Sequence, residues 1–239
     1  MEKGLDIAVV GGGVIGLACA RALQRDGHRV VVHDPAPAAD TAAAWGSAGV
    51  FAVDSVSPFA TPETLRALPT MLLHRDSGLS LRWGYMPRLL PWLFRFLWNA
   101  RPAASERGAA VLAALCAEGL AGWGALLGER AAARLVRPGG WVTAFETEAG
   151  LRAARADVER RLRHGVVAEW LDGPDLRRRV PQLGEHVVGG VYYEQSRFCP
   201  DPAALLATLV ADIEAAGGGF RRAPVSALAP AAATVDVLA

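Results

Sequence analysis

The chain has 239 residues, of which 52% are hydrophobic and 21% are charged, and its formal net charge is +1. This length suffices for one large domain or two small ones, and the apolar content excludes a disordered protein. The near-neutral charge gives no electrostatic reason to expect a nucleic-acid partner.

The predicted elements open with a strand, a helix and a second strand. β-branched and apolar residues over 6–10 predict a buried parallel strand, and the spacing over 14–25 predicts a helix capped by Gly27. A second strand covers 29–33, before a small-residue loop over 36–50 with a short helical turn. The later elements are, in chain order, a mostly helical region over 61–135 broken at Pro69, Pro87, Pro91 and Pro102, a strand over 139–147, a helix over 148–164, a strand over 166–170, a short helix within 172–183 capped by Asp172, a strand over 187–195, a helix over 201–218 capped by Asp201, and a strand over 220–225.

A GxGxxG motif lies between the first strand and the first helix, at Gly11, Gly13 and Gly16. Gly11 permits a tight turn, Gly13 lets the backbone approach a pyrophosphate, and Gly16 lets the helix pack close to the strand. The positive end of the helix then faces the phosphates. A strand–helix turn without a ligand is the alternative, but the surrounding elements favour a dinucleotide site.

Asp34 ends the second strand, 18 residues after Gly16. A carboxylate there accepts hydrogen bonds from ribose hydroxyls and repels a 2′-phosphate, which argues against NADP. The motif itself serves FAD and NAD alike. Its position near the N-terminus and the following "WGSAG" loop favour FAD, because a loop of small residues allows backbone to approach a flat ring; an ordinary flexible loop is the alternative.

The order of these segments resembles the D-amino-acid dehydrogenase branch of the glycine oxidase and D-amino-acid oxidase flavoproteins. The resemblance is carried by the opening unit and by "AAAWGSAGVFAVDSVSP", "SLRWGYMPRLLPWLFRFL" and "GGVYYEQSRFCPDPAALLATLVADIEAAGG". It implies non-covalent FAD and oxidation of an amine beside a carboxylate by hydride transfer to flavin N5. An amino acid would be the substrate, and a quinone, a dye or oxygen would accept the electrons.

The resemblance also implies roles for individual residues and leaves the catalytic residues unknown. Asp34 would bind ribose where the family more often has Glu, and Val225 would lie near the adenine by backbone contacts. Cys199 stands where the family often has His, and we expect a buried small side chain rather than a reactive thiol. The residues expected at the pyrophosphate are Gly11, Gly13, Val14, Ile15 and Gly16, and those expected at the flavin are Ser47, Ala48 and Gly49.

The expected fold is α/β, with a Rossmann-like FAD-binding domain of the glutathione-reductase type interrupted by an α+β substrate domain. The first part of the FAD domain covers 1–60, the substrate domain 61–195, and the FAD domain returns, incomplete, over 196–239. Because members of the family are longer, we expect a C-terminally truncated chain that is inactive alone. The alternative is a non-catalytic dinucleotide-binding fragment or a subunit of a split flavoenzyme. Such a subunit would need a complementing chain or would form an oligomer.

The remaining features predict few other partners. Three separated cysteines without a CxxC pair and five histidines without HxH or HExxH indicate neither a disulfide framework nor a metal site. The opening residues do not have the pattern of a signal peptide, so we expect a cytoplasmic protein. The aromatic and basic stretch 88–98 suits a peripheral contact with the cytoplasmic membrane face; a helix buried in the substrate domain is the alternative.

Overall fold

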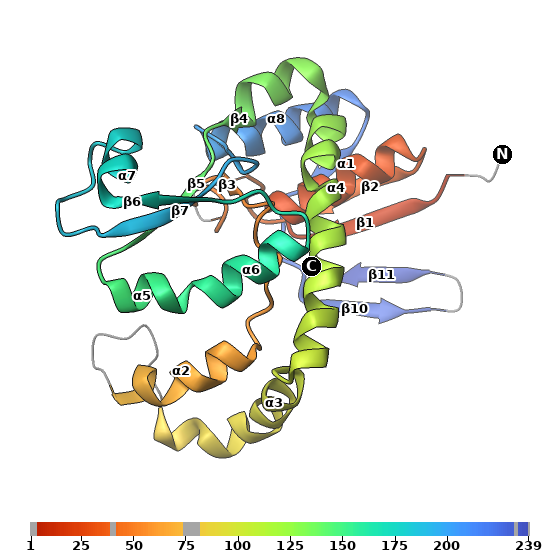
Figure 1. Cartoon of the computed structure of the whole chain (residues 1–239). Helices are drawn as coiled ribbons and strands as arrows, with labels where there is room; N and C mark the ends of the chain where they lie inside the picture. The colour runs from red at the N-terminus through yellow and green to blue at the C-terminus, as the bar shows by residue number, and fades with distance from the viewer. Residues whose placement is uncertain (1–3, 39–41, 74–81, 232–233, 239) are drawn as a thin grey trace. The chain divides into compact units, whose positions relative to one another are not determined.

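The computed structural model describes residues 4–38, 42–73, 82–231 and 234–238 (Figure 1). The predicted loop over 36–50 and the predicted helical region over 61–135 each lie partly outside these residues. The chain forms two compact units, each built from separated segments of sequence. Unit 1 contains residues 1–51, 120–139 and 197–239, and unit 2 contains residues 52–119 and 140–196.

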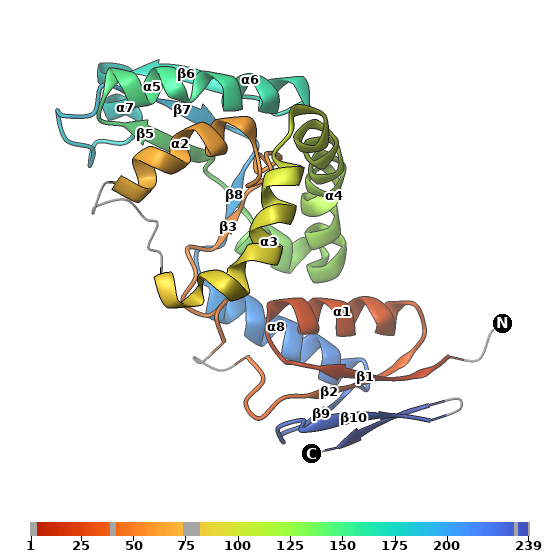
Figure 2. The ribbon, with the colours of Figure 1, turned by 90° about the horizontal axis from the view of Figure 1, so that it is seen from below.

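Unit 1 is built on a three-stranded parallel sheet. Its strands, in the order β1-β2-β9, are β1 (Asp6–Val10), β2 (Arg29–His33) and β9 (Gly219–Arg221). Helices α1 (Val14–Arg25) and α8 (Pro202–Ala215) cover one face of this sheet (Figure 2). The two helices pack against each other through fully buried apolar side chains such as Leu17 and Leu206. Burial of this kind stabilises by about 1.5–3 kcal/mol per large side chain.

The α1 helix ends as its sequence predicts. Gly27 has a φ of 90°, which suits glycine, and the His28 amide donates to the Leu23 carbonyl at 3.1 Å. Asp201 likewise caps α8 by accepting a hydrogen bond from the Ala204 amide at 2.9 Å. These local signals explain why both predicted helices are found.

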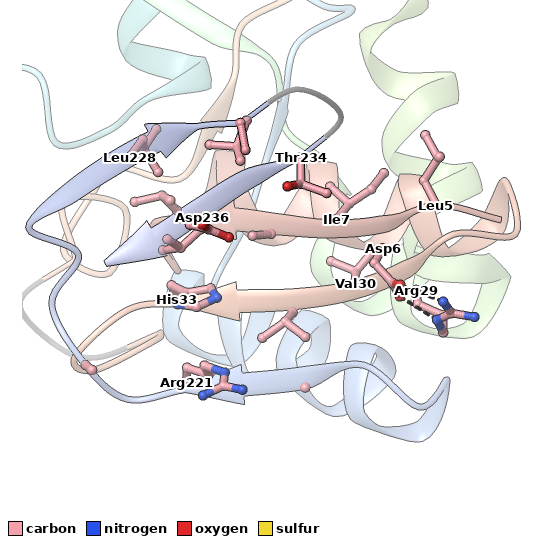
Figure 3. Close-up of a pocket in the computed structure, with 18 of the residues that line it drawn as sticks. Leu5, Asp6, Ile7, Arg29, Val30, His33, Arg221, Leu228, Thr234 and Asp236 are labelled. Carbon is pink, nitrogen blue, oxygen red and sulfur yellow. Dashed lines mark hydrogen bonds and ion pairs between the residues drawn. The ribbon is translucent and has the colours of Figure 1, made fainter. Parts of the chain in front are cut away.

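The other face of the sheet lies under a hairpin that the sequence did not predict, formed by β10 (Ala227–Pro230) and β11 (Val235–Leu238). Figure 3 shows the groove between this hairpin and β1, β2 and β9. Val10 on this face is 53% exposed, and Ile7 and Val9 on the other face are only partly buried, so β1 is not the buried strand that the sequence predicted. The groove has a volume of about 1760 Å³, which exceeds the roughly 300–1,000 Å³ of small-molecule pockets. The glycines of the GxGxxG turn do not line it.

A small antiparallel sheet and part of a long helix complete unit 1. The sheet consists of β3 (Val50–Phe51), β8 (Arg197–Phe198) and β4 (Arg137–Pro138). Helix α4 (Pro102–Leu135) has a non-helical residue at Gly128, where φ is 72° and ψ is 163°. Among the described residues, α4 passes a test of length and composition for a helix that could cross a membrane. Core helices of soluble proteins also pass this test. Of the window that passes this test, 6% is buried. In the second part of α4, Leu127 and Leu135 are buried in unit 1.

Unit 2 is built on a three-stranded antiparallel sheet in the order β5-β7-β6. Two small cores lie in this unit, one around Val158, Val191 and Tyr193 and one around Leu171 and Leu176. Its strands are β5 (Trp141–Phe145), β6 (Glu169–Asp172) and β7 (Gly189–Tyr193), and its helices are α2 (Pro62–Leu73), the short 3₁₀ helix η1 (Trp83–Tyr85), α3 (Met86–Asn99), the first part of α4, α5 (Glu148–Ala153), α6 (Arg155–Arg163) and α7 (Gly173–Arg179).

Several predicted boundaries in unit 2 were wrong. Pro69 and Pro91 lie inside α2 and α3 rather than breaking them. A proline inside a helix costs about 3 kcal/mol, and in both helices leucines, which are good helix formers, lie on either side of the proline. The predicted helix over 148–164 is interrupted at Ala154, and the predicted strand over 166–170 is shifted to 169–172.

The division of the chain differs from the predicted one over 120–139. This segment was expected in the substrate domain but belongs to unit 1. The physical reason is packing: Leu127 and Leu135 share a buried core with Cys199 and the helix residues Leu205 and Leu206.

Candidate functional site

The GxGxxG turn joins β1 to α1 at the carboxyl end of the parallel sheet. Gly11 has a φ of 104°, a backbone conformation that L side chains rarely adopt. Its amide donates to the His33 carbonyl at 2.9 Å, which ties the turn to the end of β2. Ligands of open α/β sheets bind at this end of the strands.

Gly16 and Gly13 are required for different physical reasons. A Cβ on Gly16 would lie 1.9 Å from the Gly11 carbonyl oxygen, so only glycine allows α1 to approach the turn. A Cβ on Gly13 would meet nothing within 4 Å. The space in front of Gly13 is therefore open to a ligand, whereas the space at Gly16 is filled by the chain itself.

The N-terminus of α1 is suited to an anion. Gly13 is its N-cap, and among the described residues no side chain caps the helix and no acid lies in its first turn. The first amides of a helix have no acceptor within the helix, and the helix dipole favours negative charge there. Val14 and Ile15 begin this helix, and Ile15 is 74% exposed.

Asp34 directly follows β2 and holds the turn through both carboxylate oxygens. Oδ2 accepts a hydrogen bond from the Gly12 amide at 2.7 Å, and Oδ1 accepts one from the Ala36 amide at 2.8 Å. Each oxygen retains a lone pair that a ribose hydroxyl would use. Gly12 was not predicted to matter, although a Cβ there would lie 2.6 Å from Pro37 Cβ. The run of three glycines was the signal for it.

The loop predicted to line a flavin is anchored at one end. Ser47 and Ala48 are exposed, and the Ser47 Oγ accepts a hydrogen bond from the Gly49 amide at 3.3 Å. The Gly49 carbonyl accepts from the Cys199 amide at 2.6 Å, and a Cβ on Gly49 would lie 2.5 Å from the Cys199 carbonyl oxygen. The loop thus presents small residues and backbone to solvent while its end is fixed to unit 1.

Cys199 is a buried core residue, as the sequence predicts. Its residue is 6% exposed, and burial raises the pKa of the thiol above its ordinary value. A protonated, buried thiol is a poor nucleophile. Its contribution to the site is the backbone contact with Gly49.

Val225 lies in the loop between β9 and β10, where it is half-buried. The preceding strand ends at Arg221, whose carbonyl accepts from the Asp34 amide at 3.0 Å. The predicted nucleotide residues are therefore all carried by unit 1. The structure brings the glycine turn and Asp34 into direct contact, whereas no described contact joins Ser47 or Val225 to them.

A buried charge cluster in unit 2 was missed by the sequence analysis. Asp54 is 2% exposed; its Oδ2 accepts from Arg161 Nη1 at 2.7 Å and its Oδ1 accepts from Ser196 Oγ at 2.5 Å. Arg161 Nε also donates to Asp157 at 2.8 Å. The partners are separated by more than 100 residues, and no sequence spacing indicates such a pairing.

The donor set fits a dinucleotide and not a metal. Residues 4–38, 42–73, 82–231 and 234–238 contain no group of three or more metal-ligating side chains. The open cradle at Gly13, the uncapped helix and the carboxylate of Asp34 match a pyrophosphate and a ribose. Together with the parallel sheet, they define a dinucleotide-binding α/β domain.

Comparison with known proteins identifies the family. The sequence model of the family described as FAD dependent oxidoreductase (DAO) matches residues 6–238. The chain is 32% identical over 232 residues to a D-amino-acid oxidase of Bradyrhizobium diazoefficiens, covering 95% of the chain and 54% of that relative. It is 30% identical to D-amino acid dehydrogenase 2 of Ralstonia nicotianae over 79% of the chain and 45% of that relative. The chain therefore belongs to the FAD-dependent oxidoreductase family, whose cofactor is FAD rather than NAD.

Solved structures show the same fold. Glycine oxidase from Geobacillus kaustophilus superposes with a TM-score of 0.59 at 19% identity, over 96% of this chain and 50% of that one. Glycine oxidase from Bacillus cereus gives a TM-score of 0.58 at 17% identity. The chain spans about half the length of the relatives that it matches.

Proposed function

We propose that unit 1 binds FAD at the glycine turn and forms the cofactor-binding part of an amino-acid oxidoreductase. The observation that carries this proposal is the open, uncapped helix N-terminus at Gly13, with Asp34 fixed beside it by the Gly12 amide. In a domain of the glutathione-reductase type, the α1 amides would hold the pyrophosphate and Asp34 the ribose. The loop Ser47–Gly49 would lie along the flavin and Val225 along the adenine.

Relatives named D-amino-acid oxidase and D-amino acid dehydrogenase support a proposal for the substrate class. We propose oxidation of the amine of a D-amino acid, glycine or a proline-like amino acid to an imino acid, with a quinone, a dye or oxygen as final acceptor. The bound flavin would supply the redox chemistry by accepting a hydride at N5. The protein would contribute positioning and electrostatics.

We further propose that the 239-residue chain has no turnover alone. A substrate carboxylate needs a cationic partner in a dry pocket, best provided by a bidentate arginine. The resemblance implies that this arginine lies in the half of the family members' sequence that this chain does not match. The second candidate is a non-catalytic dinucleotide-binding fragment or a subunit that is completed by a second chain.

Two measurements test these proposals separately. The cofactor released from the denatured protein identifies the ligand; tightly bound NAD without flavin would contradict the FAD site. Dye reduction with D-alanine, D-proline and glycine, on protein saturated with FAD, tests turnover. A rate near 10 s⁻¹, the order typical of enzymes, from a monomeric sample would contradict the proposed inactivity. Recovery of activity on adding a separately expressed downstream segment would support the split enzyme.

A further inference from the structure

The segment from Arg82 to Ser105 has an unusual composition for a soluble surface. It contains four arginines and six aromatic residues but no aspartate, glutamate or lysine. It includes η1, α3 and the first residues of α4. All four arginines are exposed. The segment therefore carries a local charge of +4 on a chain whose net charge is only +1.

Helix α3 has two distinct faces. Leu89, Leu93 and Phe96, spaced by four and three residues, are the partly buried face. None of its 14 residues is buried, so α3 packs only shallowly. We define the exposed aromatic and arginine side chains of η1 and α3 as the outer face. They are Trp83, Tyr85, Arg88, Trp92, Phe94, Arg95 and Trp98, and Trp92 borders the partly buried side, where it stacks on Phe96.

The aromatic side chains of the outer face are strongly exposed. Trp83 is 76% exposed, Phe94 69%, Trp98 65% and Trp92 56%. Leaving such side chains in water costs roughly 1.5–3 kcal/mol each relative to burying them, and contiguous exposed apolar surface marks an interaction site. The outer face is therefore a surface that gains free energy when it is covered.

Contacts between the rings and the arginines order this face. Trp92 stacks on Phe96 with 5.1 Å between the ring centroids, and the Arg101 guanidinium lies 3.4 Å from the centroid of Trp98. Tryptophan and arginine together suit a boundary that is apolar on one side and anionic on the other, since both side chains combine a flat apolar surface with a polar tip.

We propose that the outer face docks on a lipid bilayer that contains anionic lipids, with α3 lying in the plane of the interface. A helix of 14 residues is about 21 Å long, shorter than the roughly 30 Å core of a bilayer, so it lies on the membrane rather than spanning it. The tryptophans would enter the boundary between headgroups and acyl chains, and Arg88 and Arg95 would pair with lipid phosphates. The four arginines, with no acid between residues 82 and 105, favour this occupant over an apolar protein surface.

Vesicle flotation tests the proposal with the whole chain, because aggregates sink while vesicle-bound protein floats. The probes are phosphatidylcholine vesicles with and without phosphatidylglycerol, at low and high salt. We expect flotation with the anionic vesicles and much less with phosphatidylcholine alone, and we expect added salt to weaken it. No flotation with anionic vesicles, or equal and salt-insensitive flotation with both, would overturn the proposal.

Two pairs of variants locate the surface. R88Q/R95Q should lower the affinity for anionic vesicles roughly 25-fold, because each arginine near such a surface contributes about fivefold. R152Q/R155Q, which removes two exposed arginines of α5 and α6, is the matched control and should bind as the unchanged chain does. Equal effects of the two pairs would contradict docking through the outer face.

A tryptophan pair separates a membrane from a protein partner. W92A/W98A should lose vesicle binding, whereas W170A, which removes a tryptophan of β6 that is 41% exposed, should retain it. The alternative is a contact between protein copies through the outer face. In that case the unchanged chain would be oligomeric without lipid and would fail to float, and the W92A/W98A variant would be monomeric. That set of results would show that the proposal is wrong. Should W92A/W98A lose its circular dichroism spectrum, quenching of tryptophan fluorescence by brominated anionic lipid decides instead: quenching supports docking, and its absence refutes it.

Discussion

Replacing Gly13 and Gly16 in turn by alanine separates the two roles that glycine has in the turn. At Gly16 the new Cβ would overlap the Gly11 carbonyl oxygen, 1.9 Å away, so the turn or α1 must shift. Overpacking of this kind costs about 1–3 kcal/mol. A change of 1 kcal/mol shifts Tm by roughly 2–4 °C for domains of 150–250 residues. G16A should therefore lower Tm by about 2–12 °C.

G13A should leave stability nearly unchanged but weaken FAD binding. Its Cβ meets nothing within 4 Å, and a φ of −77° with ψ of 179° is open to alanine. Alanine is a poorer N-cap than glycine by a few tenths of a kcal/mol or more. Alanine also restricts the unfolded chain, which stabilises by about 0.4–1 kcal/mol, so the two effects nearly cancel. The methyl group, however, would occupy the space through which a pyrophosphate approaches the backbone.

Thermal unfolding without ligand gives the stability of both variants, and the rise of Tm with added FAD gives affinity through RT ln(1 + [L]/Kd). The expected pattern is a low Tm for G16A and a normal Tm with a reduced FAD response for G13A. An unchanged FAD response in G13A would refute the placement of the pyrophosphate at Gly13. An unchanged Tm in G16A would refute the close packing of α1 on the turn.

Three further predictions concern charged groups. D34A should weaken FAD binding by about 1.5–3 kcal/mol, or tenfold or more, in a titration of flavin fluorescence. Unchanged affinity would mean that the ribose lies elsewhere. D34A should also lower Tm, because the Gly12 amide loses its acceptor. R161A should cost about 3–5 kcal/mol in denaturant unfolding, because Asp54 is left buried without its cation; a loss below 1 kcal/mol would show that water replaces the arginine. Although desolvation opposes ionisation of Glu63, its hydrogen bond from Arg160 keeps the pKa of this carboxyl below its ordinary 4.5. Its contribution to stability is therefore complete above about pH 4.5 and is lost as the pH falls through the lowered pKa; the fall in Tm with acid should be smaller in E63Q.

The sequence predicted the nucleotide-binding unit well because its signals are local. The bounds of β1, α1 and β2 agree with the predicted 6–10, 14–25 and 29–33. Alternation, glycine spacing and caps act within a few residues of one another, so a single sequence contains them. The family followed from the order of such segments.

Features that depend on distant partners were missed. The hairpin β10–β11 has a proline and alanine-rich sequence, and its position is set by the sheet face beneath it rather than by its own pattern. The pairing of Asp54 with Arg161 and Ser196 leaves no periodic trace. Segment 120–139 belongs to unit 1 through burial of Leu127 and Leu135, which helical periodicity alone does not reveal.

The interleaving of the two units has a consequence for how the protein is made. In unit 1, Gln24 of α1 hydrogen-bonds the carbonyl of Ile213 in α8, 189 residues later. At about 5–20 residues per second, a ribosome needs roughly 10–40 s to synthesise the intervening chain. During that time the apolar side of α1 has no α8 to pack against. The newborn N-terminal segment is therefore a natural client for chaperones that shield apolar helices until their late partner emerges.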